Sequence, residues 1–548
     1  GGVKKIEGAF ETQGGIVTYA VGHIIELADP DEYLNEANKG WRLESLPILP
    51  SEWKSKVVAK SAAQYKIIEK LIKQATEVIV ATDSDREGEV IARELLDRMG
   101  YKGKIKRLWL SALDPESVRK GLANLYDGAI HAPLYHAGLA RQRSDWLIGM
   151  NLTRAFTKIS GGRGKEGVLS IGRVQTPTLA LLVDRDRAIE SFVKTPFYEV
   201  SVNVQGQPLP AAESPPFTAR WLANAKIETS AVLADDEADL ASEQGYRCSN
   251  IDQAKTVLAA VKANDFGKVS RVIHKRVESA PPLLFSLSEL QEVVSKRYGV
   301  SVKEVLDVAQ SLYEKHKLTS YPRTDCHHLP LSQLGEAPQV IELISMRNTL
   351  HAKIATQCEL KRVSKCWNDT KVAESSHHGI IPTRNTQVNM LDLSVLEQRV
   401  YDLVARRYLM QFLPPALFDD TRIELEIAEY NFVATGRVSI LEGWKIAELA
   451  TSAPSEAADK MPALPKMAQD DTVRVLNAEM KTGKTSPPPA FTEGSLLKAM
   501  KNISKLIQDP QLKAVLKETA GIGTEATRAE IIDTLKKRPL ISVSGKKQ

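Results

Sequence analysis

A short apolar segment that runs directly into acidic residues most constrains how this chain can fold. Residues Glu77-Val-Ile-Val-Ala-Thr82 are rich in β-branched side chains and predict a buried strand. An acidic turn follows, and then an amphipathic helix ending at Gly100, with its inward face formed by Val90, Ile91, Leu95, Leu96 and Met99. Because strand, turn and helix form the unit of a parallel sheet, we expect an α/β domain with a ligand site at this turn.

Length and composition indicate a multidomain folded protein. The 548 residues predict three or four domains at about 150 residues each. The net charge of +5 is a mild basic excess, so affinity for nucleic acid requires a local basic surface. No apolar run of about 18 residues and no secretory signal are visible. Four cysteines without C-x-x-C spacing argue against a zinc ribbon or a disulfide scaffold and fit a reducing cytoplasm.

The rest of the chain divides into β-rich and helical regions. Residues 196–280 alternate with period two at Phe197–Val204, and a second strand-like region spans about 420–450. The segment from Thr451 to Gln469 is predicted to be a loop. Residues 283–405 are mostly helical, with capping boxes at Ser286…Glu289 and Ser301…Glu304. Since β-rich regions flank this helical block, we expect one domain to be inserted into another.

The acidic turn is a candidate metal site. Asp83, Asp85 and Glu87 are spaced i, i+2, i+4, which places all three carboxylates on one side of an extended segment. Converging carboxylates favour a hard cation such as Mg²⁺. The alternative is an acidic N-terminal helix cap without a metal.

Tyr321 is a candidate nucleophile. It lies in a predicted extended segment, and Arg323 can share its face. A phenol attacks poorly unless a cation stabilises the charge that develops, and the planar guanidinium of arginine suits a phosphate. The alternative is an ordinary half-buried tyrosine beside a solvated arginine.

Two further segments have residues suited to phosphate. Ser376-His-His-Gly-Ile-Ile-Pro-Thr383 offers a histidine for phosphate binding or acid–base work, or one that merely caps or borders a core. Gly521-Ile-Gly-Thr-Glu-Ala-Thr-Arg-Ala-Glu530 is a glycine-rich turn before a helix, with a capping box expected at Thr527…Glu530. It either binds phosphate or is an ordinary capped helix.

An arginine cluster indicates a nucleic-acid channel. Arg141, Arg143 and Arg154 flank Trp146, and Arg173 follows. Arginines with an aromatic ring suit single-stranded nucleic acid, although a helix with solvated charges is the alternative. Gly483-Lys-Thr485 is not a Walker A motif, because position 478 is alanine, so no P-loop is expected.

Together these segments resemble the type IA DNA topoisomerases, and within that family bacterial topoisomerase III. Ala81–Glu89 is similar to the family's TOPRIM acidic motif and Ser320–Asp325 to its active-site tyrosine motif. Ile171–Pro177, Ser376–Thr383, Gly521–Arg528 and Gly22-His23 also match, in family order.

The resemblance implies a multidomain α/β, α and β fold, in which a TOPRIM domain, a β-rich arch and helical domains form a torus. We expect the TOPRIM domain at 1–150 and a helical base at 151–195 and 483–548. The arch is expected at 196–280 and 406–482, and a helical lobe with the tyrosine at 281–405.

The resemblance also implies a mechanism. Tyr321 attacks a single-strand phosphodiester and forms a 5′-phosphotyrosine bond. Arg323 stabilises the phosphate, and His377 contacts it. Asp83 and Asp85 hold Mg²⁺, needed chiefly for religation, while Glu87 shares the metal site or assists proton transfer. A second strand then passes without ATP, and the reaction relaxes negative supercoils or decatenates DNA.

Further matched positions imply contacts with DNA. They are Arg141, Arg143, Arg154, Arg173, Gln175, Thr176, Thr324, Thr524, Thr527 and Arg528. The implied partner is single-stranded DNA, or DNA with single-stranded regions, bound by a monomer. We expect a bacterial, cytoplasmic, DNA-associated protein without a membrane segment.

Two departures from the family pattern stand out. Relatives open with a strand ending in Glu-Lys-Pro-Ser, whereas this sequence opens at Gly1-Gly-Val-Lys-Lys-Ile-Glu7. It also stops at Gly545-Lys-Lys-Gln548, before any C-terminal DNA-binding tail. We therefore expect weak or absent religation. The alternatives are a metal-dependent TOPRIM nuclease and a catalytically inert single-strand DNA clamp.

Overall fold

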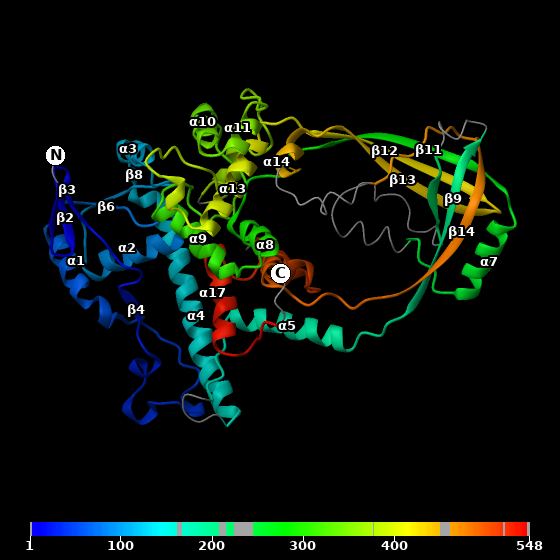
Figure 1. Cartoon of the computed structure of the whole chain (residues 1–548). Coiled ribbons are helices and arrows are strands. Elements are labelled where there is room, and N and C mark those ends of the chain that lie inside the picture. The colour runs from blue at the N-terminus through cyan, green and yellow to red at the C-terminus, as the bar shows by residue number, and fades with distance from the viewer. Residues whose placement is uncertain are drawn as a thin grey trace.

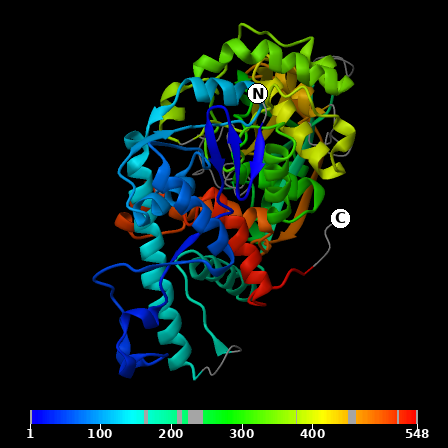
Figure 2. The ribbon, with the colours of Figure 1, turned by 90° about the vertical axis from the view of Figure 1, so that its left-hand side faces the viewer.

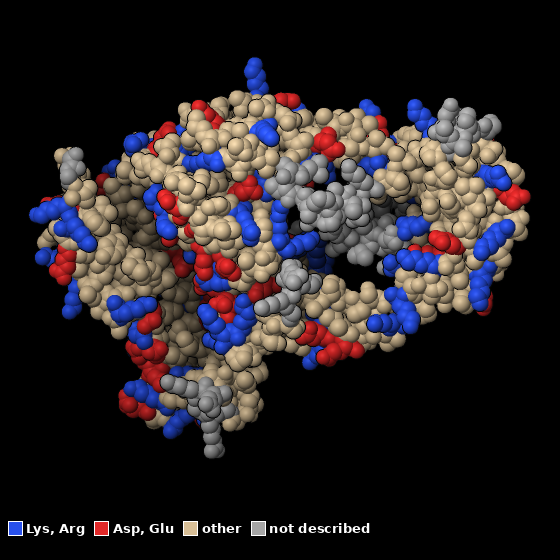
Figure 3. Space-filling model, viewed as in Figure 1, with Lys and Arg blue, Asp and Glu red and all other residues tan. Residues whose placement is uncertain are grey.

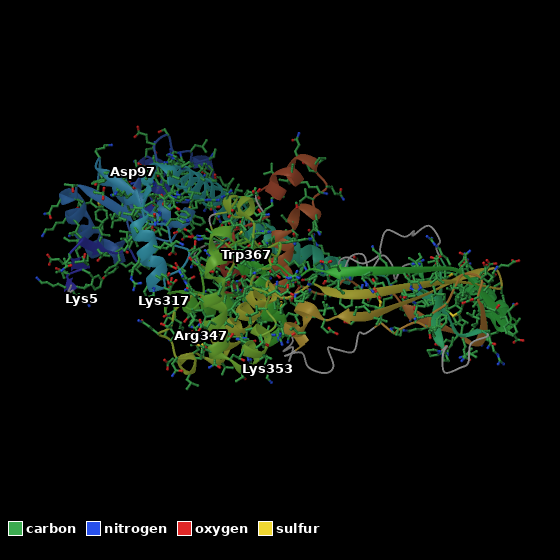
Figure 4. All side chains as sticks on the ribbon, turned by 90° about the horizontal axis from the view of Figure 1, so that it is seen from above. Lys5, Asp97, Lys317, Arg347, Lys353 and Trp367 are labelled. Carbon is green, nitrogen blue, oxygen red and sulfur yellow. The ribbon has the colours of Figure 1, made fainter. Side chains whose placement is uncertain are left out.

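The computed structural model describes residues 3–161, 167–207, 215–223, 245–375, 377–449, 461–518 and 521–544. An α/β part, a helical lobe and a β-barrel follow one another across the molecule (Figure 1). Viewed from above, Lys5 and Asp97 lie at the α/β end, whereas Arg347, Lys353 and Trp367 lie in the lobe (Figure 4). Within the described ranges no helix is long and apolar enough to cross a membrane.

The α/β part contains the predicted strand and helix. Strand β6 (Glu77–Val80) pairs in parallel with β7 (Lys104–Arg107), and β8 (Tyr126–Asp127) adds an antiparallel edge. Helix α2 (Arg86–Arg98) buries Val90, Leu95 and Leu96, as predicted. The prediction of a fully buried strand is wrong: β6 is an edge strand of the described sheet, and Ile79 is 43% exposed.

Smaller elements surround this sheet. They are β1 (Lys4–Ile6), β2 (Ala9–Thr12), β3 (Gly15–Thr18), β4 (Ile25–Leu27), β5 (Ser55–Val57), α1 (Ala62–Gln74) and α3 (Pro115–Ala123). Strands β1 to β3 form an antiparallel meander that faces the viewer in Figure 2.

Long helices connect the α/β part to the rest of the molecule. Helix α4 (Ala132–Ile159) packs on α2, and helix α5 (Gln175–Glu190) leads toward the barrel (Figure 1). Helices α15 (Glu493–Lys501), α16 (Pro510–Glu518) and α17 (Glu525–Lys537) lie near them. The expected domain boundary at 150/151 falls inside α4.

Helix α17 begins earlier than predicted. Thr524 is its N-cap and forms a capping box with Thr527, so the expected box at Thr527…Glu530 is wrong. Gly521 and Gly523 both adopt positive φ, at +89° and +71°. This turn directs the chain into the helix at Glu525, one helical turn before the predicted start.

The helical lobe contains the predicted capped helices. Ser286 and Ser301 cap α8 (Leu287–Tyr298) and α9 (Val302–Glu314), and Gly299 ends α8 at φ +67°. Both predicted boxes are only half formed: each serine accepts from the backbone amide of its glutamate, but neither glutamate carboxylate returns a bond to its cap, and that of Glu289 accepts from Arg407 instead. The other lobe helices are α10 (Ala337–Arg347), α11 (Thr349–Ala355), α12 (Asp369–Ala373) and α13 (Val395–Met410).

Helix α13 crosses the expected boundary at 405/406. Tyr408 and Leu409, beyond that boundary, are buried in the same apolar core as Val294 and Leu312. The next strand begins only at Ala416. The lobe therefore extends about ten residues further along the chain than the sequence pattern indicates.

The β-rich regions form a closed six-stranded barrel in the order β10-β13-β12-β11-β14-β9. Its strands are β9 (Pro196–Gln207), β10 (Phe217–Trp221), β11 (Phe266–Ser279), β12 (Ala416–Ile427), β13 (Tyr430–Leu441) and β14 (Thr472–Lys484). The predicted alternation in β9 is confirmed, since Val200, Val202 and Val204 are buried.

Of two segments beside the barrel, one was not predicted from the sequence and the other was predicted in part. Helix α7 (Ile251–Lys262), which packs on β9 and β14, was not predicted. Helix α14 (Ile446–Leu449) precedes the predicted loop, of which residues 451–460 lie outside the described residues. Residues 461–469 contain neither helix nor strand, as predicted.

The barrel stands away from the helical body. Strands β11 to β13 reach it from the lobe, while β9 and β14 connect it to the region of α5 and α15 (Figure 1). In the space-filling view an opening separates barrel from body, and Lys and Arg side chains gather at its rim (Figure 3).

Candidate active site

The acidic turn is shaped by the start of helix α2. Asp85 is the N-cap and accepts a hydrogen bond from the Gly88 amide at 2.7 Å. A Cβ at Gly88 would lie 2.1 Å from the Asp83 carbonyl oxygen, so only glycine allows this close approach. Asp85 therefore caps the helix and also lies beside Asp83, although from the sequence alone a helix cap and an acidic cluster were alternatives.

Arg107, in strand β7, fixes the backbone of this turn. Its buried guanidinium donates to the carbonyls of Thr82 and Asp83 at 2.8 and 2.6 Å, and to the Glu89 carboxylate at 2.6 Å. Because these bonds join β7 to the turn after β6, the two acidic side chains start from a rigid backbone.

Glu87 does not join the other two carboxylates. Helix α2 begins at Arg86, so the predicted extended spacing ends at Asp85 and Glu87 turns away. Its carboxylate faces His23, with Nε2 to Oε1 at 3.7 Å. Glu87 and Glu94 together raise the pKa of His23 to about 9.

Tyr321 lies directly against the acidic turn. Its side chain is 1% exposed, and its backbone amide donates to the Ser111 carbonyl at 2.8 Å. The phenol donates to Asp85 Oδ2 at 2.7 Å. Burial and then the charges of Asp85 and Asp83 raise the pKa of Tyr321 well above its usual range, so the resting phenol is protonated.

Arg323 is near the same acids. It lines the cleft beside Tyr321, and Tyr321, Glu87 and Asp83 outweigh burial and raise its pKa. Its Nε is buried and has no hydrogen-bond partner within the described residues. The guanidinium therefore has a donor available for an anionic ligand.

Of the two adjacent histidines, His377 faces the site. Its ring centroid is 4.2 Å from that of Tyr321, and neither ring nitrogen has a hydrogen-bond partner among the described residues. Burial, and then His378, lower the pKa of His377 to about 3, so the ring is neutral. His378 is buried and its Nδ1 contacts the Gly379 carbonyl at 2.8 Å.

Asp83 and Asp85 fit a magnesium ion. Burial and the neighbouring Asp85 raise the pKa of Asp83, and the opposing effect of Arg323 does not cancel them, so a bound cation would stabilise the pair. Within the described ranges no group of three His, Cys, Asp or Glu side chains converges as a metal site. Mg²⁺ commonly uses only one or two carboxylates together with water and substrate phosphate, so two acids suffice.

Asp85, Glu87, Arg323 and His377 line one cleft with a volume of 1150 Å³, and Tyr321 adjoins it through its hydrogen bond to Asp85. The cleft joins the α/β part, the lobe and the N-terminus of α17. Its polar lining includes Asp85, Glu87, Arg141, Arg323, Thr324, His377, Thr524 and Thr527. Arg141 donates to Thr527 Oγ1 at 3.5 Å and so connects α4 to α17.

Several predicted DNA contacts lie elsewhere. Arg154 is buried and binds Asp31 at 2.9 Å, and Arg528 is buried against Glu525 at 2.8 Å. Trp146 is also buried and donates its indole N–H to the Ala28 carbonyl. These side chains hold segments of the protein together, and Trp146 also lines the cleft.

The remaining predicted DNA contacts have protein partners. Arg143 lies over the Trp53 ring, and Arg173 binds Asp145 at 2.8 Å. Gln175 bonds to Ser170, and Thr176 accepts from the Gly172 amide at 3.1 Å. Of these four, none is among the residues that line the cleft.

Sequence reasoning missed Arg107, Trp109 and Ser111. Arg107 is the last residue of strand β7, and Trp109 and Ser111 follow it; the carboxyl end of β7 meets the same sheet edge as the acidic turn. The sequence contained a signal that could have identified these residues. Lys104–Arg107 is a short strand, and neighbouring parallel strands bring their carboxyl ends to the same edge of a sheet.

Comparison with known proteins decides the family. A Toprim domain matches residues 2–113, and the DNA topoisomerase family matches residues 129–548. The chain belongs to the type IA DNA topoisomerases. Its activity is that of this family, the passage of DNA strands.

Several relatives of this topoisomerase are bacterial proteins. DNA topoisomerase 3 of Vibrio cholerae is 38% identical over 99% of this chain and 82% of the relative. The corresponding protein of Pasteurella multocida is 38% identical over 97% of this chain and 80% of its own. The structure of topoisomerase I from Thermotoga maritima matches with a TM-score of 0.67 at 22% identity, covering 96% of this chain and 76% of that one. This last match shows similarity of the fold alone.

Proposed function

We propose that this topoisomerase cleaves one DNA strand with the Tyr321 hydroxyl and rejoins it after strand passage. The observation that carries the proposal is the hydrogen bond from the Tyr321 phenol to Asp85 Oδ2 at 2.7 Å, within a cleft that also presents Arg323 and His377. A nucleophile in contact with an acceptor and beside a phosphate-binding cation is the arrangement that transesterification requires.

In the proposed step the Tyr321 oxygen attacks a backbone phosphorus. A tyrosine–phosphorus bond forms at the 5′-phosphate, the bond to the 3′-oxygen breaks, and a free 3′-hydroxyl leaves. Asp85 accepts the phenol proton and passes it to the leaving 3′-oxygen, and the reverse reaction runs the same transfer backwards. The number of phosphoester bonds is unchanged, so the cycle needs no nucleotide hydrolysis.

Arg323 and His377 act on the phosphate. The Arg323 guanidinium offsets charge on the non-bridging oxygens as the fifth bond forms. His377 is neutral and has two unpartnered nitrogens, so it donates one N–H to the phosphate without adding charge. Thr324 and Thr524 line the same cleft and supply hydroxyl contacts.

Asp83 and Asp85 are the residues that would hold Mg²⁺. When bound there, the ion would supply positive charge near the phosphate and position the broken ends. Glu87 faces His23, so we propose no metal role for it.

The substrate proposed for this cleft is single-stranded DNA. Arg141 and Thr527 line the cleft beside the nucleophile and come from different helices, which suits a backbone that runs between them. The lobe lifts from the α/β part, and a second strand enters the opening bounded by the barrel. This proposal divides the chain into a Toprim domain, a barrel arch, a tyrosine lobe and a base containing α15 and α17.

We infer that the protein acts as a monomer in the bacterial cytoplasm, on chromosomal or plasmid DNA. Its relatives are bacterial, and its four cysteines are unpaired.

The experiment uses a single-stranded oligonucleotide labelled at its 3′ end, incubated with and without Mg²⁺ and stopped with SDS. We expect label at the size of the protein, absent for Tyr321→Phe and retained for Tyr313→Phe. Tyr313 is a matched control, because it is buried and its ring lies 5.3 Å from that of Tyr321.

The other outcomes are equally distinct. Cleavage without a protein adduct contradicts the proposal and indicates a nuclease. Salt-sensitive binding without cleavage also contradicts it and indicates a clamp.

A further inference from the structure

Trp109 occupies a rigid position at the edge of the cleft. It follows strand β7, and the preceding Leu108 amide donates to the Val80 carbonyl at 2.9 Å, which extends the pairing with β6. Trp109 lines the cleft together with His131 and His377. Its backbone is therefore fixed by the same sheet that carries the acidic turn.

The Trp109 ring takes part in a series of ring contacts that ends at the nucleophile. It stacks on His131, with centroids 4.2 Å apart and planes 8° apart. It also stacks on His377, at 6.0 Å and 19°. His377 in turn lies 4.2 Å from Tyr321. The Arg107 guanidinium lies 5.1 Å from the Trp109 ring and supports it from the sheet side.

No side chain in the described part of the chain forms a hydrogen bond that would orient the His377 ring. Both ring nitrogens are buried, and the polar group that acts on the imidazole from nearby is the backbone of Ser84. An imidazole rotates broadly about its terminal torsion unless neighbours restrict it. Its orientation is consequently set by packing, and Trp109 and Tyr321 are the two rings that pack against it.

We propose that Trp109 is a positioning residue that orients His377 for phosphate by stacking, and this rests on the proposed role of His377. Stacking leaves both imidazole nitrogens available for DNA, whereas a carboxylate or carbonyl partner would occupy one of them. A flat ring at position 109 is therefore the requirement.

The test compares Trp109→Phe with Trp109→Leu. Phe keeps a flat face, while Leu keeps an apolar side chain without one. We expect Trp109→Leu to slow single-turnover adduct formation by about 3- to 10-fold, and Trp109→Phe to remain close to the unmodified protein. Affinity for the oligonucleotide, measured by anisotropy in a Tyr321→Phe background, is expected to change little for both variants.

A second measurement separates positioning from structure. If Trp109 acts through His377, Trp109→Leu adds less than about a twofold loss once His377→Ala is present. Equal losses in both backgrounds would overturn the inference. The inference would also be overturned if Trp109→Phe and Trp109→Leu slowed cleavage equally. Unchanged cleavage by His377→Ala alone would instead contradict the proposed function of His377.

The matched control is Tyr126→Leu. Tyr126 is 49% exposed and contacts the His131 ring edge-on at 5.7 Å, outside the cleft lining. We expect normal cleavage for this variant. Thermal unfolding of each variant verifies that loss of activity does not reflect loss of the fold.

Discussion

At the scale of single residues, the proposed cleavage depends on one hydrogen bond between parts that are distant in the chain. Tyr321 belongs to the lobe and Asp85 to the Toprim domain, yet the phenol donates to the carboxylate at 2.7 Å. The same carboxylate caps α2 through its other oxygen. Asp85 is therefore held in place by the helix while it accepts from the nucleophile.

Replacing Asp85 by Asn is expected to slow cleavage without unfolding the site. Asn still caps a helix but cannot take the phenol proton, so we expect adduct formation to fall by about 100-fold or more. The measurement is single-turnover cleavage in EDTA, which removes metal effects. Asp83→Asn is the matched control and is expected to cleave normally there, and equal loss in both variants would contradict the role of Asp85.

At the scale of elements, His23 ties the segment before β4 to helix α2. Its imidazole lies 3.7 Å from Glu87 and 3.9 Å from Glu94, and these carboxylates raise its pKa to about 9. Since the folded pKa lies above the unfolded value of about 6.5, the stabilisation is complete below pH 6.5 and is lost as pH rises to about 9.

The interaction of His23 with Glu87 and Glu94 predicts how the free energy of unfolding changes with pH. After screening by solvent, the contribution is on the order of 1 kcal/mol. We expect the unfolding free energy to decline between pH 6.5 and 9, and His23→Ala to remove that part of the decline. Denaturant titrations across this range measure it, and identical pH profiles for both proteins would refute the pairing.

Local signals in the sequence predicted individual elements well. The caps of α8 and α9, the inward face of α2 and the alternation in β9 follow from short-range rules. The start of α17 was missed because two glycines with positive φ set it. Glu87 was misplaced because the helix begins at Arg86, inside the segment that the pattern assumed to be extended. Arg154, Arg528 and Trp146 look like DNA contacts by residue type, and only their buried partners reveal a structural role.

At the scale of the whole molecule, the proposed mechanism requires the lobe to leave the Toprim domain. Closure of the barrel and contact between Tyr321 and Asp85 both depend on pairings across hundreds of residues, which no local pattern predicts. Ion pairs also cross this junction. Arg384 of the lobe binds Glu116 of α3 at 2.8 Å, and Lys120 of α3 binds Glu336 at 3.1 Å.

Breaking this junction is expected to favour the open state. Glu116 is half exposed, so its pair with Arg384 is worth about 0.5–1 kcal/mol, or two- to fivefold in the opening equilibrium. We expect Glu116→Gln to raise the open fraction in fluorescence energy transfer between α3 and α10, most clearly at low salt. Lys371→Gln is the control, because its pair with Glu374 lies within the lobe. No difference between the two variants would contradict a latch at this junction.

The most direct test of the account is to locate the covalent bond between protein and DNA. Adduct trapped on an oligonucleotide is digested with protease, and mass spectrometry identifies the peptide that carries the nucleotide. We predict the peptide containing Tyr321, joined to a 5′-phosphate, with a polymerase-extendable 3′-hydroxyl on the released fragment. Attachment at another residue, or through a 3′-phosphate, would contradict the account.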